Sequence, residues 1–150
     1  MTGHRPAYLQ WKNLGVVAGG GTLGTAIREL VSLIVPSIGG LPVAVFAINL
    51  LGAFALGILL EALARRGPDE GRRRTLRLLL GTGVLGGFTT YSALATDTAV
   101  LLVDGRTAAA LSYSLASVIL GALSTWAGIA VAASARRRRE RRPSESEVAR

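Results

Sequence analysis

A short run in the middle of the chain gathers residue types that are unusual inside an apolar segment. From Gly81 to Asp97 the sequence reads GTGVLGGFTTYSALATD, with no charged residue before its last position. Each glycine weakens a helix by about 1 kcal/mol relative to alanine, so the run predicts an interrupted helix. Backbone carbonyls exposed by an interruption within a membrane cannot face lipid. They can bind a cation or line a cavity.

Three other polar side chains within apolar segments are candidates for handling an ion. Asn49 is the only side-chain amide there, and its NH2 group offers two donors, although packing between helices is an alternative role. Arg28 follows Gly20 and Gly24 at four-residue spacing, which places all three on one helix face. A cation at this depth faces protein, water or the membrane surface. Asp97 is an acid near the end of its segment and is therefore a functional candidate.

Four apolar segments must position these residues, and each is long enough to cross a membrane, which takes about 20 residues. They cover residues 14–35, 41–64, 76–103 and 107–135. Irregular backbone cannot face lipid, so the expected fold class is an all-α integral membrane protein with four transmembrane helices, the third of them broken. Residues 1–13 are expected to form a cytoplasmic N-terminus, and residues 136–150 a basic disordered cytoplasmic tail.

Composition argues against several other classes of protein. Half of the 150 residues are hydrophobic, and the absence of cysteine excludes disulfides and thiol chemistry. The net charge is +8, but the basic residues punctuate apolar segments and form no face on a soluble fold, which argues against nucleic-acid binding. No apolar segment contains a histidine or a pair of carboxylates, so an enzyme is not expected.

The basic residues are distributed very unevenly between the two ends of the predicted helices. Fifteen of the 17 Lys and Arg residues lie in the N-terminus, the link at 65–77 and the tail, which are all on one side. Arg106 is the only basic residue in a loop on the other side. The positive-inside rule therefore predicts a multi-pass protein of the cell membrane with both termini in the cytoplasm.

The segments GGTLGTAIR, NLLGAF and GGFTTYSALATD, in this order, resemble the CrcB/Fluc fluoride channels of bacteria. The resemblance covers roughly residues 14 to 132. It implies an antiparallel dimer of four-helix subunits with two narrow pores. Such a channel exports fluoride passively and lowers its cytoplasmic concentration, without an enzymatic step.

The resemblance also implies roles for individual residues. A structural sodium ion at the dimer centre would be held by backbone carbonyls of Gly86 and Thr89. Arg28 and Asp97 would lie at the vestibule, with Asp97 in place of a common glutamate. The implied pore positions are Asn49, Tyr91, Ser92, Leu94, Tyr113 and Ser117.

The chain departs from the family where two phenylalanines are usual, because it has Tyr91 and Leu94 at these positions. The edge of an aromatic ring is electropositive, so Tyr91 keeps a contact for an anion and Leu94 provides none. An antiparallel homodimer also requires balanced loop charge, which this chain lacks. Both observations favour pairing with an oppositely oriented homologue, and they leave a homodimer, a heterodimer and a non-conducting partner subunit open.

Two further classes compete with a fluoride channel. A small proton-coupled multidrug exporter also has four helices, but it requires a carboxylate near the middle of a span and a wide aromatic cavity. Here Glu29 lies in the outer half of its segment and aromatic residues make up only 5% of the chain. A non-transporting membrane scaffold would explain the glycine-rich faces, but not Asn49 together with an interrupted third helix.

Overall fold

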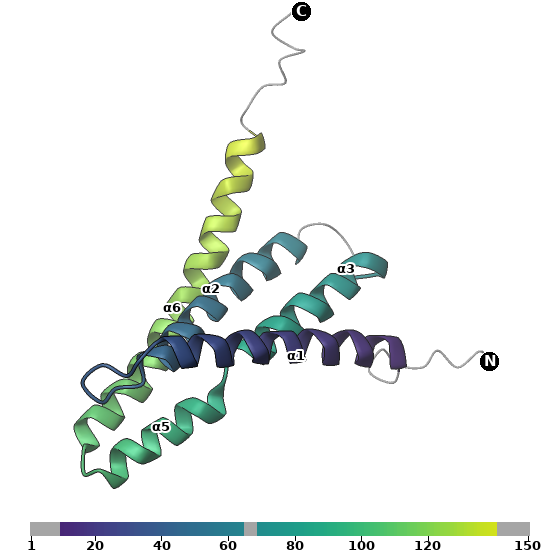
Figure 1. Ribbon diagram of the computed structural model, residues 1–150. Coiled ribbons are helices and arrows are strands. Elements are labelled where there is room, and N and C mark those ends of the chain that lie inside the picture. The colour runs from purple at the N-terminus through teal and green to yellow at the C-terminus, as the bar shows by residue number, and fades with distance from the viewer. Residues whose placement is uncertain (1–9, 65–68, 141–150) are drawn as a thin grey trace, which may run out of the picture.

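The computed structural model describes residues 10–64 and 69–140, with side chains as far as residue 137. This part of the chain is helical apart from short connections (Figure 1). Its elements are α1 (Trp11–Ile34), α2 (Val43–Ala64), α3 (Gly71–Leu76), the π-helix η2 (Arg77–Leu85), α4 (Gly86–Phe88), α5 (Tyr91–Val103) and α6 (Thr107–Glu140). The predicted all-α class is confirmed for these residues.

Three helical stretches in the described part are long and apolar enough to cross a membrane: residues 43–64, 71–103 and 107–137. They correspond to the second, third and fourth predicted spans. The first predicted span is also helical, as the 24 residues of α1, but glycines and the Arg28–Glu29 pair make it less apolar than the others.

The end of the last helix corrects a predicted boundary. α6 continues to Glu140, so residues 136–140 are helical and do not begin a disordered tail. Arginine and glutamate are good helix formers, and extending an existing helix avoids the cost of nucleation. The 34 residues of α6 span about 50 Å, more than the hydrocarbon core requires. Residues 1–9 and 141–150 of the predicted termini lie outside the described residues.

The helices pack as groups that are not in sequence order. α1 lies against η2 and α4, whereas α2 lies mainly against α6, and α5 forms a hairpin with the first part of α6 (Figure 1). The two halves of the third span therefore have different neighbours. Most large apolar side chains point outward, and Leu111, Leu115 and Val118 of α6 are each at least 60% exposed, as expected for surfaces facing lipid or another subunit.

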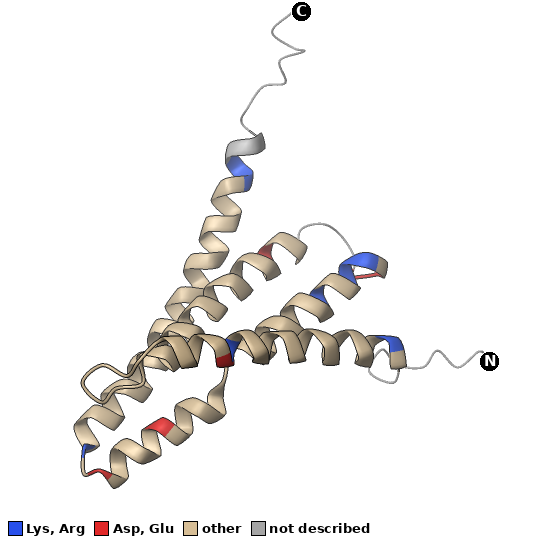
Figure 2. Cartoon of the chain, in the orientation of Figure 1, with Lys and Arg blue, Asp and Glu red and all other residues tan. Residues whose placement is uncertain are grey.

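Charged residues gather at the two ends of this arrangement. Figure 2 shows basic residues at the start of α1, around α3 and near the end of α6, away from the α5–α6 turn. The described members of this set are Lys12, Arg72, Arg73, Arg74, Arg77, Arg136 and Arg137. The turn at the opposite end carries Asp104 and Arg106.

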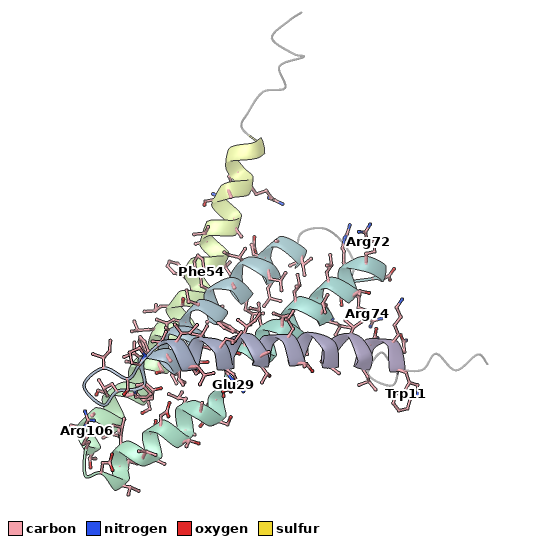
Figure 3. The ribbon with its side chains drawn as sticks, in the orientation of Figure 1. Trp11, Glu29, Phe54, Arg72, Arg74 and Arg106 are labelled. Atoms are coloured by element: carbon pink, nitrogen blue, oxygen red, sulfur yellow. The ribbon has the colours of Figure 1, made fainter. Side chains whose placement is uncertain are left out.

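Arg106 joins the two loops at its end of the molecule. Its guanidinium donates to the carbonyls of Gly39 and Gly40 at 3.0 and 3.1 Å, and it lies beside the α1–α2 loop in Figure 3. Both glycines have positive φ, as a tight two-residue turn between Ile38 and Leu41 requires. The isolated basic residue on this side is therefore a link between the α1–α2 and α5–α6 connections.

Two glycines bring α2 and α6 into close contact. A Cβ atom at Gly57 would overlap the carbonyl of Thr125, and a Cβ atom at Gly128 would overlap the carbonyl of Phe54. Small residues of this kind allow helix backbones to approach each other within a membrane, where the hydrophobic effect does not drive helix association.

Replacing Gly128 by alanine should therefore destabilise the protein by about 1–3 kcal/mol, because the added methyl group meets backbone that cannot move aside. The matched control is Gly121→Ala in the same helix, where an added Cβ meets nothing within 4 Å. Thermal unfolding of both variants in detergent measures the difference. Equal melting temperatures would show that the α2–α6 contact is looser than the structure indicates.

Candidate functional site

The third span is interrupted at two threonines and not at its glycines. Helical backbone continues from Arg77 through Phe88, and Thr89 and Thr90 then adopt extended conformations before α5 begins. The interruption lies inside the run from Gly81 to Asp97 in which the sequence predicts one, but the glycines of the run remain helical. Gly83 and Gly87 allow close packing against α1 instead: a Cβ at Gly87 would overlap the carbonyl of Gly21.

The same explanation applies to the glycines of α1. Gly20 and Gly24 are buried against η2, where an added Cβ at Gly24 would overlap the carbonyl of Val84. The predicted shared face of Gly20, Gly24 and Arg28 is confirmed, and it is the face that contacts the third span.

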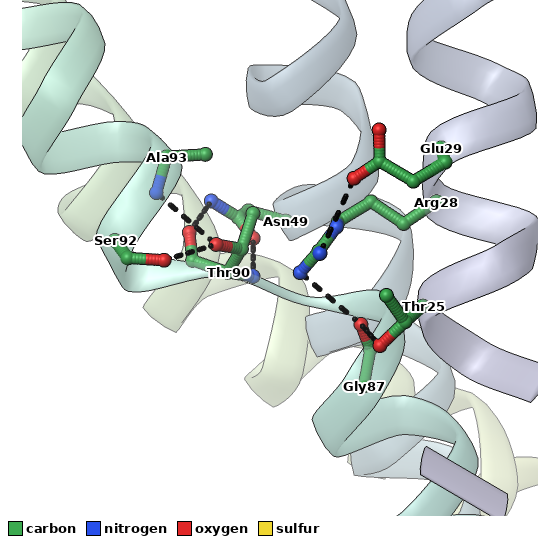
Figure 4. A network of polar contacts seen from close by, with 8 residues as sticks. All are labelled: Thr25, Arg28, Glu29, Asn49, Gly87, Thr90, Ser92 and Ala93. Carbon is green, nitrogen blue, oxygen red and sulfur yellow. Dashed lines mark hydrogen bonds and ion pairs between the residues drawn. The ribbon is translucent and has the colours of Figure 1, made fainter. Parts of the chain in front are cut away.

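Asn49 of α2 forms hydrogen bonds with both backbone groups of Thr90, a residue of the interruption. Its Oδ1 accepts from the N–H of Thr90 at 2.8 Å, and its Nδ2 donates to the carbonyl of Thr90 at 3.0 Å (Figure 4). The amide therefore performs the packing role weighed from the sequence. It uses one of its two N–H donors in doing so, and the second is available for another acceptor.

Thr90 caps the second half of the span. Its hydroxyl oxygen accepts from the N–H of Ala93 at 3.1 Å, the ordinary interaction of an N-cap threonine, and it lies 3.1 Å from the hydroxyl of Ser92 (Figure 4). Thr90 is buried, so this cap is protected from water.

Together these contacts change the partners of two carbonyls. In an uninterrupted α-helix the N–H of Thr90 would donate to Gly86 and the N–H of Ala93 would donate to Thr89. Here those N–H groups donate to Asn49 and to the Thr90 side chain instead. The carbonyls of Gly86 and Thr89 therefore lose their usual helical donors.

Gly86 and Thr89 differ in how they face the rest of the subunit. A Cβ at Gly86 would meet nothing closer than the Gly81 carbonyl at 3.8 Å, so this face of α4 is uncovered. Thr89 is half-buried, and its hydroxyl donates to the Leu85 carbonyl at 2.9 Å. Its methyl group packs on Gly52, where a Cβ atom would overlap it.

Arg28 reaches the last turn of the first half of the span. Its guanidinium lies 3.4 Å from the carbonyl of Gly87, which Thr25 also approaches at 3.4 Å, and 3.3 Å from the carboxylate of Glu29 (Figure 4). The Arg28 side chain is only 22% exposed, so it faces protein. Cationic donors at the negative end of a helix are favourable.

A polar cavity of about 350 Å³ opens beside this network. It brings together both residues predicted for the vestibule, Arg28 and Asp97, which come from different helices. The other polar residues that line it are Glu29, Ser32, Thr90, Ser92 and Thr96. The interruption thus connects a set of hydroxyl, carboxylate and guanidinium groups to Asn49 through Thr90.

The predicted pore residues divide into two sets. Leu94, Tyr113 and Ser117 are buried within the subunit, where Leu94 and Tyr113 belong to one apolar cluster. The Tyr113 hydroxyl lies 3.4 Å from Asp97, and the Ser117 hydroxyl donates to the Tyr113 carbonyl at 2.7 Å.

Of the other three predicted pore residues, Asn49 is partly buried at the interruption, and Tyr91 and Ser92 lie on the surface. Tyr91 is 80% exposed in the first turn of α5. A single subunit therefore does not bring all of the predicted pore residues around one path.

Three residues at this site were not singled out from the sequence. Thr90 caps the N-terminus of α5. The sequence could have indicated this role, because threonine is a preferred N-cap residue and accepts from the N–H three residues later. Thr25 shares a helix face with Arg28, three residues away. Gly52 had no signal beyond its type, since its need for a small side chain depends on Thr89 of another helix.

Comparison with known proteins agrees with this architecture. The sequence profile of the CrcB-like protein family, also described as Camphor Resistance (CrcB), matches residues 15–129. "Fluoride-specific ion channel FluC 2" of Leifsonia xyli is 51% identical over 128 residues, which cover 85% of this chain and 88% of that protein.

Two other relatives are similar over most of their length. "Fluoride-specific ion channel FluC 1" of Cutibacterium acnes is 48% identical over 78% of this chain and 82% of its own. "Fluoride-specific ion channel FluC" of Mesorhizobium japonicum is 40% identical over 81% of this chain and 97% of its own. With matches of this extent, the chain belongs to the CrcB-like family.

Proposed function

We propose that this chain is a subunit of a fluoride-specific channel that exports fluoride passively across the cell membrane. The observation that carries the proposal is the similarity to relatives named fluoride-specific ion channels, at 40–51% identity over most of both chains. The interrupted span supports it, since irregular backbone within a membrane is tolerated where it lines a cavity or is buried in protein. Conduction down a gradient involves no chemical step.

Asn49 is the central donor of the proposed anion path. Fluoride is small and strongly hydrated, so dehydrating it requires close hydrogen-bond donors. The second N–H of the Asn49 amide supplies one, at a depth where a polar group is otherwise costly. Ser92, beside the polar cavity, and the exposed ring of Tyr91 add a hydroxyl and a ring edge.

Tyr113 and Ser117 contribute to the path in a different manner. Both hydroxyls already have acceptors within the subunit, at Asp97 and at the Tyr113 carbonyl. Each must turn away from that acceptor to donate to an anion. Leu94 packs beside Tyr113 and offers only an apolar wall, so donors near it come from other residues.

Arg28 and Asp97 form the mouth of the path. Arg28 attracts anions toward the cavity, and its charge is partly offset by Glu29 at 3.3 Å. Asp97 has the opposite charge and shares the same cavity. A mouth that mixes both signs favours exchange of an ion over tight retention.

The proposed sodium site uses the carbonyls of Gly86 and Thr89. Oxygen donors suit a hard cation, and unwound carbonyls of broken membrane helices coordinate Na+. The break removes the helical N–H donors of the four carbonyls from residue 86 to residue 89, and Thr25 and Arg28 approach that of Gly87 instead. The carbonyls of Gly86 and Thr89 lose their donors to Asn49 and to the Thr90 side chain, so their oxygens fit the ion. One subunit offers two such oxygens, and a second subunit would add its own across the uncovered face at Gly86. When bound, the ion would join the subunits electrostatically.

The subunits of the proposed dimer are antiparallel, and this chain has both termini in the cytoplasm. The described basic residues other than Arg28 lie at the ends of the helices away from Arg106 (Figure 2). The positive-inside rule favours a cytoplasmic location for those ends. Such a bias favours one orientation only. The partner is then an oppositely oriented homologue, and the numbered names FluC 1 and FluC 2 of two relatives are consistent with paired channels.

Fluoride efflux from liposomes tests the channel function directly. Vesicles loaded with fluoride and containing the purified subunit, alone and with its partner, should release fluoride to a fluoride-selective electrode. The same vesicles loaded with chloride should retain it. The absence of fluoride release from every correctly assembled preparation would contradict the proposed function.

Co-expression separates a homodimer from a heterodimer. We expect this chain alone to give little dimer, and co-expression with an oppositely biased homologue to give a stable pair, because a membrane inserts each chain in the orientation set by its loop charges. Size-exclusion chromatography of the purified proteins measures assembly. Antiparallel homodimers of this chain that conduct fluoride unaided would rule out an obligate partner.

A further inference from the structure

We propose that the side chains of Asn49 and Thr90 set the cation affinity of the interruption by diverting two backbone N–H groups from the carbonyls of Gly86 and Thr89. The inference rests on the proposed function, in which those carbonyls hold sodium. It assigns positioning roles to both side chains and makes Asn49 common to the anion path and the cation site.

The first step concerns the carbonyl of Gly86. The N–H that a continuous helix would direct to it belongs to Thr90, and this N–H donates to Asn49 Oδ1 at 2.8 Å. The same amide holds the Thr90 carbonyl at 3.0 Å, so it fixes the whole residue rather than one atom. A second contact from α2, between Gly52 and the methyl group of Thr89, holds the neighbouring residue.

The second step concerns the carbonyl of Thr89. The N–H of Ala93 would be its donor in a continuous helix, and the Thr90 hydroxyl accepts this N–H at 3.1 Å. Thr90 is 7% exposed, so water does not readily replace that hydroxyl as an acceptor. One buried side chain therefore keeps the helix of α5 from extending backwards over the interruption.

The third step connects these bonds to ion affinity. A carbonyl that accepts an N–H has part of its negative charge neutralised, whereas one without that donor presents it fully to a cation. The carbonyls at the end of α4 also lie at the negative end of a helix dipole. Restoring either N–H to its helical acceptor should therefore weaken cation binding, even if no carbonyl oxygen is removed.

Asn49 variants separate this positioning role from anion donation. Asn49→Asp keeps an oxygen that accepts the Thr90 N–H, but it replaces the anion donor with a carboxylate. Asn49→Leu has a similar size and keeps neither function. Sodium affinity is obtained from thermal unfolding of the assembled dimer over a sodium chloride titration, with N-methylglucamine chloride holding ionic strength constant.

We expect the sodium concentration for half-maximal stabilisation to rise at least about tenfold in Asn49→Leu. In Asn49→Asp it should not rise, because the carboxylate still accepts the Thr90 N–H and its negative charge attracts the cation. Thr90→Val should show a rise of at least about fivefold, and Thr90→Ser, which keeps the capping hydroxyl, should restore the parent value. The Thr90 pair keeps the test decisive if Asn49→Leu does not assemble.

Equal sodium dependence in Thr90→Val and Thr90→Ser, or no sodium dependence in the parent dimer, would overturn the inference. An equal loss in Asn49→Asp and Asn49→Leu would overturn the role of the Asn49 oxygen. A dimer could show the expected sodium dependence in these variants and yet release no fluoride. That result would support the inference and contradict the channel function, so failure of the inference and failure of the proposed function are distinguishable.

Discussion

Asn49→Asp is expected to reduce fluoride efflux by at least about 100-fold, because a carboxylate at this position repels the anion that the amide attracts. Two like charges about 4 Å apart repel by about 4 kcal/mol at an effective dielectric constant of 20, which exceeds the energy of the lost donor. One carboxylate oxygen can still accept the Thr90 N–H, but the other cannot donate to the Thr90 carbonyl as the amide does, so assembly of the variant is verified before efflux is compared. Efflux from liposomes, followed with a fluoride electrode, measures the effect.

The matched control is Asn13→Asp, which makes the same substitution in the first turn of α1, far along the sequence from the interruption. Its fluoride efflux should equal that of the parent protein. Unchanged efflux in an assembled Asn49→Asp channel would refute the proposed role of the amide as an anion donor and would leave it only its contacts with Thr90.

Gly86→Leu is expected to weaken dimerisation while leaving the subunit folded. An added Cβ meets nothing closer than 3.8 Å within the subunit, so the new side chain has room on its own chain and projects from the uncovered face of α4. Overpacking of a close contact costs about 1–3 kcal/mol, which corresponds to roughly 5- to 100-fold weaker association. Single-molecule photobleaching in liposomes over a range of protein densities measures the dimer fraction.

Gly86→Ala provides the control, because its methyl group adds only a Cβ atom, which meets nothing closer than 3.8 Å within the subunit. This variant should dimerise almost as well as the parent protein. A normal dimer with normal sodium dependence in Gly86→Leu would place the uncovered face of α4 away from the subunit contact and would count against the proposed cation site.

The apolar spans could be predicted from the sequence because long apolar stretches in a membrane have few structural alternatives. Helix ends were less accurate: α6 continues to Glu140, since polar residues with good helix propensity extend a helix beyond its apolar part. The Gly20–Gly24–Arg28 face was also predictable, since it depends only on the helix period.

The position of the interruption was harder to predict. Glycines are weak helix formers in isolation, but Gly83 of η2 and Gly87 of α4 pack closely against α1, and the backbone stays helical there. Thr89 and Thr90 leave the helix because Asn49, forty-one residues earlier than Thr90, accepts an N–H that the helix would use. Such a long-range contact has no local signal in the sequence, and neither does the placement of Leu94 in the buried cluster.

The reciprocal glycine contacts between α2 and α6 imply an order in which the protein assembles during synthesis. α1 can pack as soon as η2 and α4 enter the membrane, but the main partner of α2 is the last helix of the chain. Until Gly128 packs against Phe54, the helix that carries Asn49 lacks its main neighbour. The contact of Asn49 with Thr90 is therefore held in its final position only after α6 has been synthesised and has packed against α2.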